Sequence, residues 1–174
     1  QMRKDACFYL GKVIGKFSFK GELLIKTDSD ELESFKKIKK FFIEQHNSLI
    51  PFFIEKCLIH KSSLLRVKVE DIDDETKANE LLKKNVYLPK ELLPKLKGNK
   101  FYFHDVINFK IIDKKIGEVG FITGFNSQTV QSLMEVRTKS KDILIPVHDH
   151  IIMKVDKKNK FIIVDLPEGL MELF

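Results

Sequence analysis

The chain has 174 residues, enough for one medium-sized domain or for two small domains of about 80 residues each. Hydrophobic residues make up 43% of it, and no run reaches the roughly 18 apolar residues of a transmembrane helix, so we expect a globular protein that does not enter a membrane. The net charge of +6 is spread over both halves: residues 1–96 carry 19 Lys and Arg against 15 Asp and Glu, and residues 97–174 carry 12 against 10. This balance excludes a strongly basic tail, and it permits an RNA-containing partner without requiring one.

The counts of arginine and cysteine further limit the RNA contacts and metal sites that we expect. Only Arg3, Arg66 and Arg137 of the 31 basic residues are arginines, so bidentate recognition of guanine edges is a poor expectation. The lysines would instead contact phosphate as point charges. Cys7 and Cys57 lie far apart and have no metal-binding spacing, so we expect two thiols in a reducing, cytoplasmic protein.

The first half is rich in predicted β-strands. β-branched, aromatic and other apolar residues dominate four runs, which are 8–15, 22–27, 50–60 and 64–70. Gly21 supplies a permissive turn position between the first two runs, and the last two form a hairpin that turns at 61–63. The stretch 31–42 has apolar residues at helical spacing, but a strand is an open alternative.

A helix and two prolines follow this region. Asp73 or Asp74 can cap a short helix over 74–85. Pro89 and Pro94 interrupt regular structure directly after it. We therefore expect a first domain over 5–88, a linker over 89–99 and a second domain over 100–174.

The second half predicts short strands in quick succession. They cover residues 107–112, 116–125, 129–138, 143–147, 150–155 and 161–166, and the connections between them have turn chemistry. Three glycines in the second of these strands indicate bulges or tight bends. Six short strands joined by hairpins favour a small closed barrel. The expected fold is mainly β, with two small barrels and one short helix before the linker.

Two groups of residues could carry catalysis or a metal. His148 and His150 flank Asp149, but a metal needs a third ligand, which the neighbouring sequence does not supply. His104 and Asp105 are adjacent, and adjacent residues of a strand point to opposite faces, which argues against an acid–base pair. We therefore expect no enzyme, no metal and no cofactor.

Three consecutive aromatics, Phe101, Tyr102 and Phe103, follow the linker. In a strand, alternation sends at least one of the three outward, where it could anchor a partner. Packing within the core or between the domains is the alternative reading.

Four motifs in chain order resemble those of the bacterial RimM family of ribosome maturation factors. They are LGKVIGKFSFKGELLIKT (10–27), FYFHDVINFKI (101–111), ILIPVHDHIIMKVD (143–156) and VDLPEGL (164–170). The residues that carry the match include Gly11, Gly21, Glu22, Pro146, Asp165, Pro167 and Gly169. The chain departs from the family where Ser18 and Asn108 replace a usual glycine and where Phe101 replaces a usual tyrosine.

The resemblance implies an N-terminal barrel like those of translation factors and a C-terminal barrel of the PRC type. It also implies a protein that binds the head of the small ribosomal subunit precursor, through ribosomal protein uS-nineteen and nearby 16S rRNA, and assists 16S rRNA processing and assembly. Separately, we expect a monomer. By position, Phe101, Tyr102, His104 and Asp105 would form the protein-partner surface.

For RNA phosphate contacts we add Lys12, Lys16 and Lys20, because a basic loop can approach a backbone closely there. The alternative function is a general RNA-binding barrel module without a dedicated ribosomal protein partner.

Overall fold

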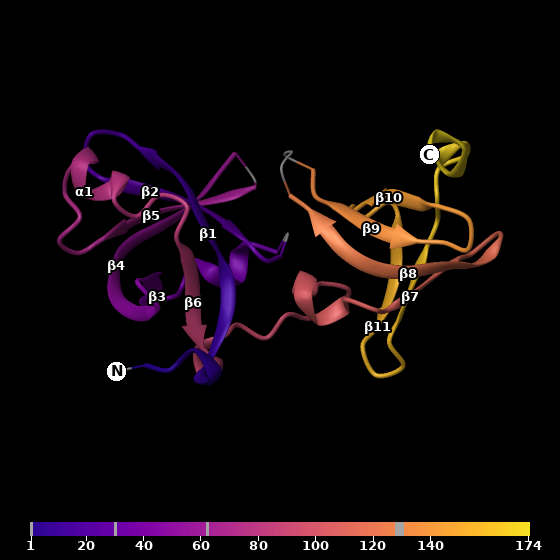
Figure 1. Cartoon of the computed structure of the whole chain (residues 1–174), viewed down its shortest axis with the longest axis horizontal. Helices are drawn as coiled ribbons and strands as arrows, with labels where there is room; N and C mark the ends of the chain where they lie inside the picture. Colours follow the sequence, from indigo (N-terminus) through magenta and orange to yellow (C-terminus); the bar gives the residue numbers. More distant parts are fainter. Residues whose placement is uncertain (1, 30, 62, 128–130) are drawn as a thin grey trace. The chain divides into compact units, whose positions relative to one another are not determined.

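The protein forms two compact units in a computed structural model that describes residues 2–29, 31–61, 63–127 and 131–174. The first unit is Gln1–Lys95 and the second is Leu96–Phe174, so the division falls within the 89–99 stretch (Figure 1). The fold is mainly β, as the sequence predicts. No helix in the described part of the chain is both long and apolar enough to cross a bilayer.

The first unit is a closed barrel of six antiparallel strands in the order β1-β2-β5-β4-β3-β6. The strands are β1 (Cys7–Phe17), β2 (Glu22–Thr27), β3 (Lys40–Gln45), β4 (Ser48–His60), β5 (Leu64–Val69) and β6 (Asn85–Pro89). Alternate residues fill the barrel, as in β5, where Leu65, Val67 and Val69 are buried between half-exposed neighbours. The four predicted runs and the β4–β5 hairpin are confirmed, although Ser62 of its turn lies outside the described residues.

The sequence leaves one stretch of this unit open between helix and strand, and it predicts one helix that proves too long. The ambiguous stretch 31–42 contains a short 3-10 turn and the first residues of β3. The predicted helix over 74–85 is too long, because α1 covers only Glu75–Asn79. Asp74 caps it as expected, accepting a hydrogen bond from the Lys77 N–H at 2.8 Å. Lys83 then takes a positive φ of 68°, and the chain enters β6, which pairs with both β1 and β3 and closes the barrel.

The second unit is a six-stranded sheet in the order β10-β9-β8-β7-β12-β11. The strands are β7 (Lys110–Asp113), β8 (Gly117–Asn126), β9 (Leu133–Arg137), β10 (Asp142–Pro146), β11 (Ile152–Asp156) and β12 (Phe161–Val164). All six strands contribute to one hydrophobic cluster, so the sheet curls around a single core. The part of the predicted third strand and its turn that falls on 128–130 lies outside the described residues.

One strand pair departs from the predicted run of hairpins. β7 and β12 are parallel, with Lys110 opposite Phe161 and Asp113 opposite Val164. The remaining pairs of this sheet are antiparallel. The last strand of the unit therefore lies beside its first strand.

Five short 3-10 turns complete the part of the chain that the structure describes. They are η1 (Lys4–Ala6), η2 (Glu33–Phe35), η3 (Lys90–Leu92), η4 (Phe103–Val106) and η5 (Leu170–Leu173).

A glycine permits a close approach of neighbouring backbone in each unit. A Cβ at Gly11 in β1 would collide with the Lys26 carbonyl oxygen of β2, and a Cβ at Gly120 in β8 would collide with the Arg137 carbonyl oxygen of β9. Both glycines lie beside a shift in strand register. The predicted bulges of the β8 segment are present here and between Ile122 and Gly124.

A buried carboxylate joins three segments of the second unit. Asp113, at the end of β7, is 2% exposed, and it accepts hydrogen bonds from the N–H groups of Lys115 and Ile116 at 2.8 and 3.0 Å. Its other oxygen accepts from the Leu166 N–H at 2.8 Å, just beyond β12. Burial opposes ionisation of this carboxyl, but the three donors together hold its pKa below the ordinary value.

Replacing Asp113 by alanine should destabilise the second unit by roughly 2–5 kcal/mol at neutral pH, because three backbone N–H groups lose their acceptor. A lowered folded-state pKa stabilises fully above the unfolded-state pKa of about 3.9, and the contribution disappears as the pH falls through the folded-state value. Urea unfolding of the full chain at neutral and acidic pH measures both effects.

The matched control is Asp142→Ala, because Asp142 is an exposed partner of Arg137 at 3.2 Å and should contribute little. Equal stability of the Asp113→Ala and Asp142→Ala variants at neutral pH would contradict this role of Asp113.

Candidate partner-binding surfaces

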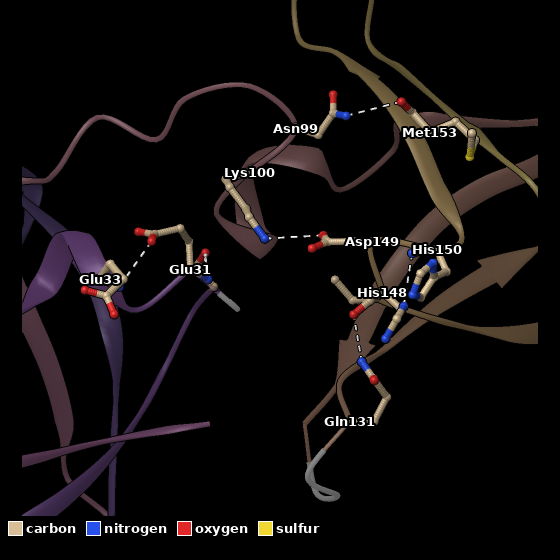
Figure 2. A network of polar contacts seen from close by, with 11 residues as sticks. Glu31, Glu33, Asn99, Lys100, Gln131, His148, Asp149, His150 and Met153 are labelled. Atoms are coloured by element: carbon tan, nitrogen blue, oxygen red, sulfur yellow. Dashed lines mark hydrogen bonds and ion pairs between the residues drawn. The ribbon is translucent and has the colours of Figure 1, made fainter. Parts of the chain in front are cut away.

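The second unit begins with a segment, Leu96–Val106, that we call the leading segment. The side chain of Asn99 makes two hydrogen bonds to β11. It donates to the Met153 carbonyl at 3.2 Å (Figure 2), and it accepts from the Val155 N–H at 3.0 Å. Lys157 donates to the Leu96 carbonyl at 3.4 Å. The backbone after residue 95 is therefore attached to the second unit.

The three aromatics of the leading segment are all buried. Phe101, Tyr102 and Phe103 are 5%, 6% and 4% exposed. Phe101 and Phe103 belong to the core cluster, where Phe103 stacks on Phe125 with ring centroids 4.3 Å apart. The expectation that alternation sends one aromatic outward is wrong, because the segment is not a strand and Phe103–Val106 forms a 3-10 turn.

The polar residues of the same turn face outward. The His104 Nε2 lies 3.4 Å from the Asp105 Oδ1, and about a third and a half of these two side chains are exposed. The Tyr102 ring stacks on the His104 imidazole at 6.1 Å. The expectation that adjacent residues point to opposite faces is also wrong here, because the segment is a 3-10 turn, to which the two-residue alternation of a strand does not apply.

His148, Asp149 and His150 form an exposed turn between β10 and β11. The two imidazoles stack at 4.9 Å, and the His150 N–H donates to the His148 Nδ1 at 3.0 Å. Lys100 of the leading segment bonds to the Asp149 carboxylate at 3.3 Å (Figure 2). Among the residues that the structure describes, no three His, Cys, Asp or Glu side chains are grouped as metal ligands would be.

Both cysteines are free thiols; Cys7 is buried and Cys57 is half-buried. Burial raises the pKa of the Cys57 thiol to about 11 and also raises that of Cys7. Neither thiol is activated as a nucleophile.

In the first unit, Glu22 organises the loop between β1 and β2. It accepts a hydrogen bond from the Ser18 hydroxyl at 3.1 Å and lies 3.1 Å from the Arg66 Nε. The Arg66 guanidinium covers the Phe17 ring at 4.6 Å. Ser18 takes a positive φ of 67°, and Gly21 takes 84° at a position where a Cβ would collide with backbone atoms of Ile72 and Asp74.

The three predicted RNA-contacting lysines have different surroundings. Lys16 forms an ion pair with Glu75 at 3.1 Å, whereas Lys20 is exposed in the loop. Lys12 is exposed on β1 directly opposite Lys26 of β2, and neither has an ion-pair partner within the described ranges. Lys26 was missed because its proximity to Lys12 depends on strand register, which the sequence does not specify.

The closing VDLPEGL motif is held by the β7–β8 turn. Asp165 lies 3.3 Å from the Lys114 Nζ and 3.0 Å from the Lys115 Nζ, and these cations lower its pKa. Lys115 also donates to the Leu166 carbonyl at 3.1 Å. Pro146 ends β10, and Pro167 and Gly169 lead into η5. The positions and contacts of these motif residues therefore indicate roles in the fold of the second unit.

These observations define a protein with two small, mainly β domains, a closed six-stranded barrel followed by a curled six-stranded sheet, whose exposed surfaces carry polar and basic side chains together with some apolar ones. Residues 8–93 match the family model described as the RimM N-terminal domain, and residues 103–170 match the RimM PRC barrel domain. The chain belongs to the RimM family.

Two curated relatives have high identity to the whole chain. A protein of Flavobacterium psychrophilum and a protein of Christiangramia forsetii, each called ribosome maturation factor RimM, are 50% identical to it over 173 residues. In both cases the match covers 99% of this chain and 99% of the relative.

Phe101→Ala should destabilise the second unit by about 3–5 kcal/mol, because it removes a core ring and leaves a cavity. Thermal unfolding of the full chain, followed by circular dichroism, measures the loss. Phe121→Ala is the control, because Phe121 is 48% exposed on β8 and its removal should change the melting temperature little. An unchanged melting temperature for Phe101→Ala would contradict this core role.

Proposed function

We propose that the protein is a ribosome maturation factor that binds the head of the assembling small ribosomal subunit and assists 16S rRNA processing. The observation that carries this proposal is the end-to-end identity of 50% with relatives called ribosome maturation factor RimM. The proposed partners are ribosomal protein uS-nineteen and nearby 16S rRNA in the cytoplasm.

The protein partner binds the second unit at the outward side of the leading segment. His104 and Asp105 are exposed and adjacent, and η4 fixes their orientation. Phe101 and Tyr102 support this surface from beneath: Phe101 anchors the segment in the core, and Tyr102 stacks on His104. A rigid support of this kind lowers the entropy that the contact residues lose on binding.

The activity requires no covalent chemistry. A protein that binds one conformation of a precursor more tightly than another shifts the population toward the first, by the difference between the two binding free energies. The protein is released when the mature conformation of the subunit binds it more weakly than the precursor conformation does. The proposal therefore assigns no catalytic residue and no cofactor.

The first test is co-sedimentation of the full chain with small-subunit precursors and with mature small subunits. We expect the chain to co-sediment with the precursors and not with the mature subunits. Equal binding to both would overturn the maturation proposal.

The protein contact is tested with the double variant His104→Ala, Asp105→Ala, in titrations with purified uS-nineteen. We expect affinity to fall about tenfold, as for exposed residues near the centre of an interface, with an unchanged melting temperature. Glu118→Ala with Asp142→Ala, two exposed acids on β8 and β10, is the control and should bind normally. Normal binding by the His104 and Asp105 variant would exclude these two residues from the partner-binding surface.

One observation favours the alternative of a general RNA-binding module. Lys12 and Lys26 are like charges directly opposite each other, an arrangement that costs free energy until an anion binds between them. A phosphate group of RNA would relieve this repulsion.

Lys12→Gln with Lys26→Gln should reduce the salt dependence of binding to unrelated RNA hairpins by about 1.8 in the slope of log K against log salt. Lys139→Gln with Lys158→Gln, which removes equal charge from exposed sites in the second unit, is the control. If the unmodified chain binds uS-nineteen but has no measurable affinity for unrelated RNA, the general module is excluded.

A further inference from the structure

The densest positive run of the chain has no role in the surfaces described above. Lys36, Lys37, Lys39 and Lys40 stand within five residues that contain no acidic side chain. Within the described ranges, only Lys36 has an ion pair, with Glu33 at 3.5 Å, and both side chains of that pair are largely exposed. Lys37 and Lys39 are exposed.

The register of β3 and β4 places this positive charge beside an exposed ring. Lys40 lies directly opposite Phe53, and its Nζ is 5.4 Å from the Phe42 ring centroid and 5.8 Å from that of Phe53. The Ile54 N–H donates to the Lys39 carbonyl at 2.8 Å, which fixes the end of the lysine run against β4. Phe53 is 49% exposed, so much of a large apolar surface remains in water.

Further aromatics continue from this position across the outer face of the barrel. Tyr87 of β6 stands between Val86 and Leu88, which are fully buried, so alternation directs Tyr87 outward. Phe42 and Tyr9 lie directly opposite it on the two neighbouring strands, and the Tyr9 and Tyr87 ring centroids are 5.8 Å apart. The Lys4 Nζ lies 5.8 Å from the Tyr87 centroid. Aromatic rings therefore follow one another over four strands, with Lys40 at the β3–β4 end and Lys4, which pairs with Glu44, beside Tyr87.

The β3–β4 part of this surface is separate from Lys12 and Lys26, although Tyr9 stands on β1 with Lys12. In the closed order of the barrel, β5 stands between β2 and β4, and β6 stands between β1 and β3. A ligand on the β3–β4 face is therefore recognised independently of the cross-strand lysine pair.

Two properties of the face select its ligand. Clustered lysines repel one another, and the negative charges of a polyanion relieve that repulsion. The counterions that the polyanion releases on binding also favour the complex. An exposed phenyl ring can stack on a flat π surface, and unpaired nucleobases present such surfaces while bases inside a duplex do not. An acidic peptide would satisfy the charges but would leave Phe53 without a stacking partner.

We propose that Lys37, Lys39, Lys40 and Phe53, the β3–β4 platform, bind single-stranded RNA, with the lysines on phosphates and Phe53 stacked on a base. The inference deepens the proposed function and rests on it for the source of the RNA, which would be an unpaired segment of the precursor. The contact requires only that one base be unstacked.

The test uses the full chain and a fluorescein-labelled oligouridine of about 12 nucleotides, within the range of single-strand sites on small barrels. Fluorescence anisotropy should show that Phe53→Ala weakens binding about tenfold, and Phe53→Leu, which keeps an apolar side chain but removes the ring, should weaken it similarly. Phe121→Ala removes a ring of equal exposure from the second unit and should bind normally.

The lysines are tested by salt titration. Lys37→Gln with Lys39→Gln should make the slope of log K against log salt shallower by about 1.4, the value for two phosphate contacts on a single strand. Lys139→Gln with Lys158→Gln is the charge-matched control. A duplex of equal phosphate number should bind more weakly than oligouridine to the unmodified chain, and Phe53→Ala should reduce that difference.

The platform is overturned if Phe53→Ala and Phe121→Ala bind oligouridine equally, or if the duplex binds more tightly than the single strand. These outcomes are distinct from failure of the proposed function, which is measured by co-sedimentation with precursors and by titration with uS-nineteen. Loss of the single-strand preference in Phe53→Ala would support the platform even if the chain did not bind precursors.

Discussion

The second unit depends on a carboxylate that is almost completely removed from water. Asp113 would be costly to bury by itself, and three backbone N–H groups compensate for that cost. Two of these donors belong to the turn after β7 and the third follows β12, so one side chain fixes the ends of two parallel strands. The VDLPEGL motif is held in place by the same interaction, and Lys114 and Lys115 then reach Asp165. The VDLPEGL motif therefore begins where Asp113 connects the ends of β7 and β12.

Local sequence predicted the strands well, and non-local contacts decided the rest. Alternating residues such as Leu65, Val67 and Val69 identify β5 without further information. β6 was missed because its five residues follow a capped helix, and their strand conformation depends on pairing with β1 and β3. The parallel pairing of β7 with β12 was missed for the same reason, since only the folded sheet brings the two ends of the unit together.

The candidate partner surface could be located from the sequence, but the roles within it could not. The resemblance to the RimM family drew attention to residues 101–105, and the motif match remains the basis for their proposed role. Alternation was the wrong rule for this segment because η4 replaces the expected strand. Consequently Phe101 is a core residue, while His104 and Asp105 provide the exposed surface. The Lys12–Lys26 pair and the β3–β4 platform each required strand register, which single-sequence patterns do not provide.

Gly11 and Gly120 have a consequence for solubility. Each allows a neighbouring carbonyl to occupy the space of a missing side chain, and each lies where a long strand shifts register between two neighbours. A methyl group at either position would force the two strands apart. The freed N–H and C=O groups would then form an open strand edge that can pair with another copy of the chain. We therefore expect a substitution at either glycine to increase edge-to-edge aggregation of the chain.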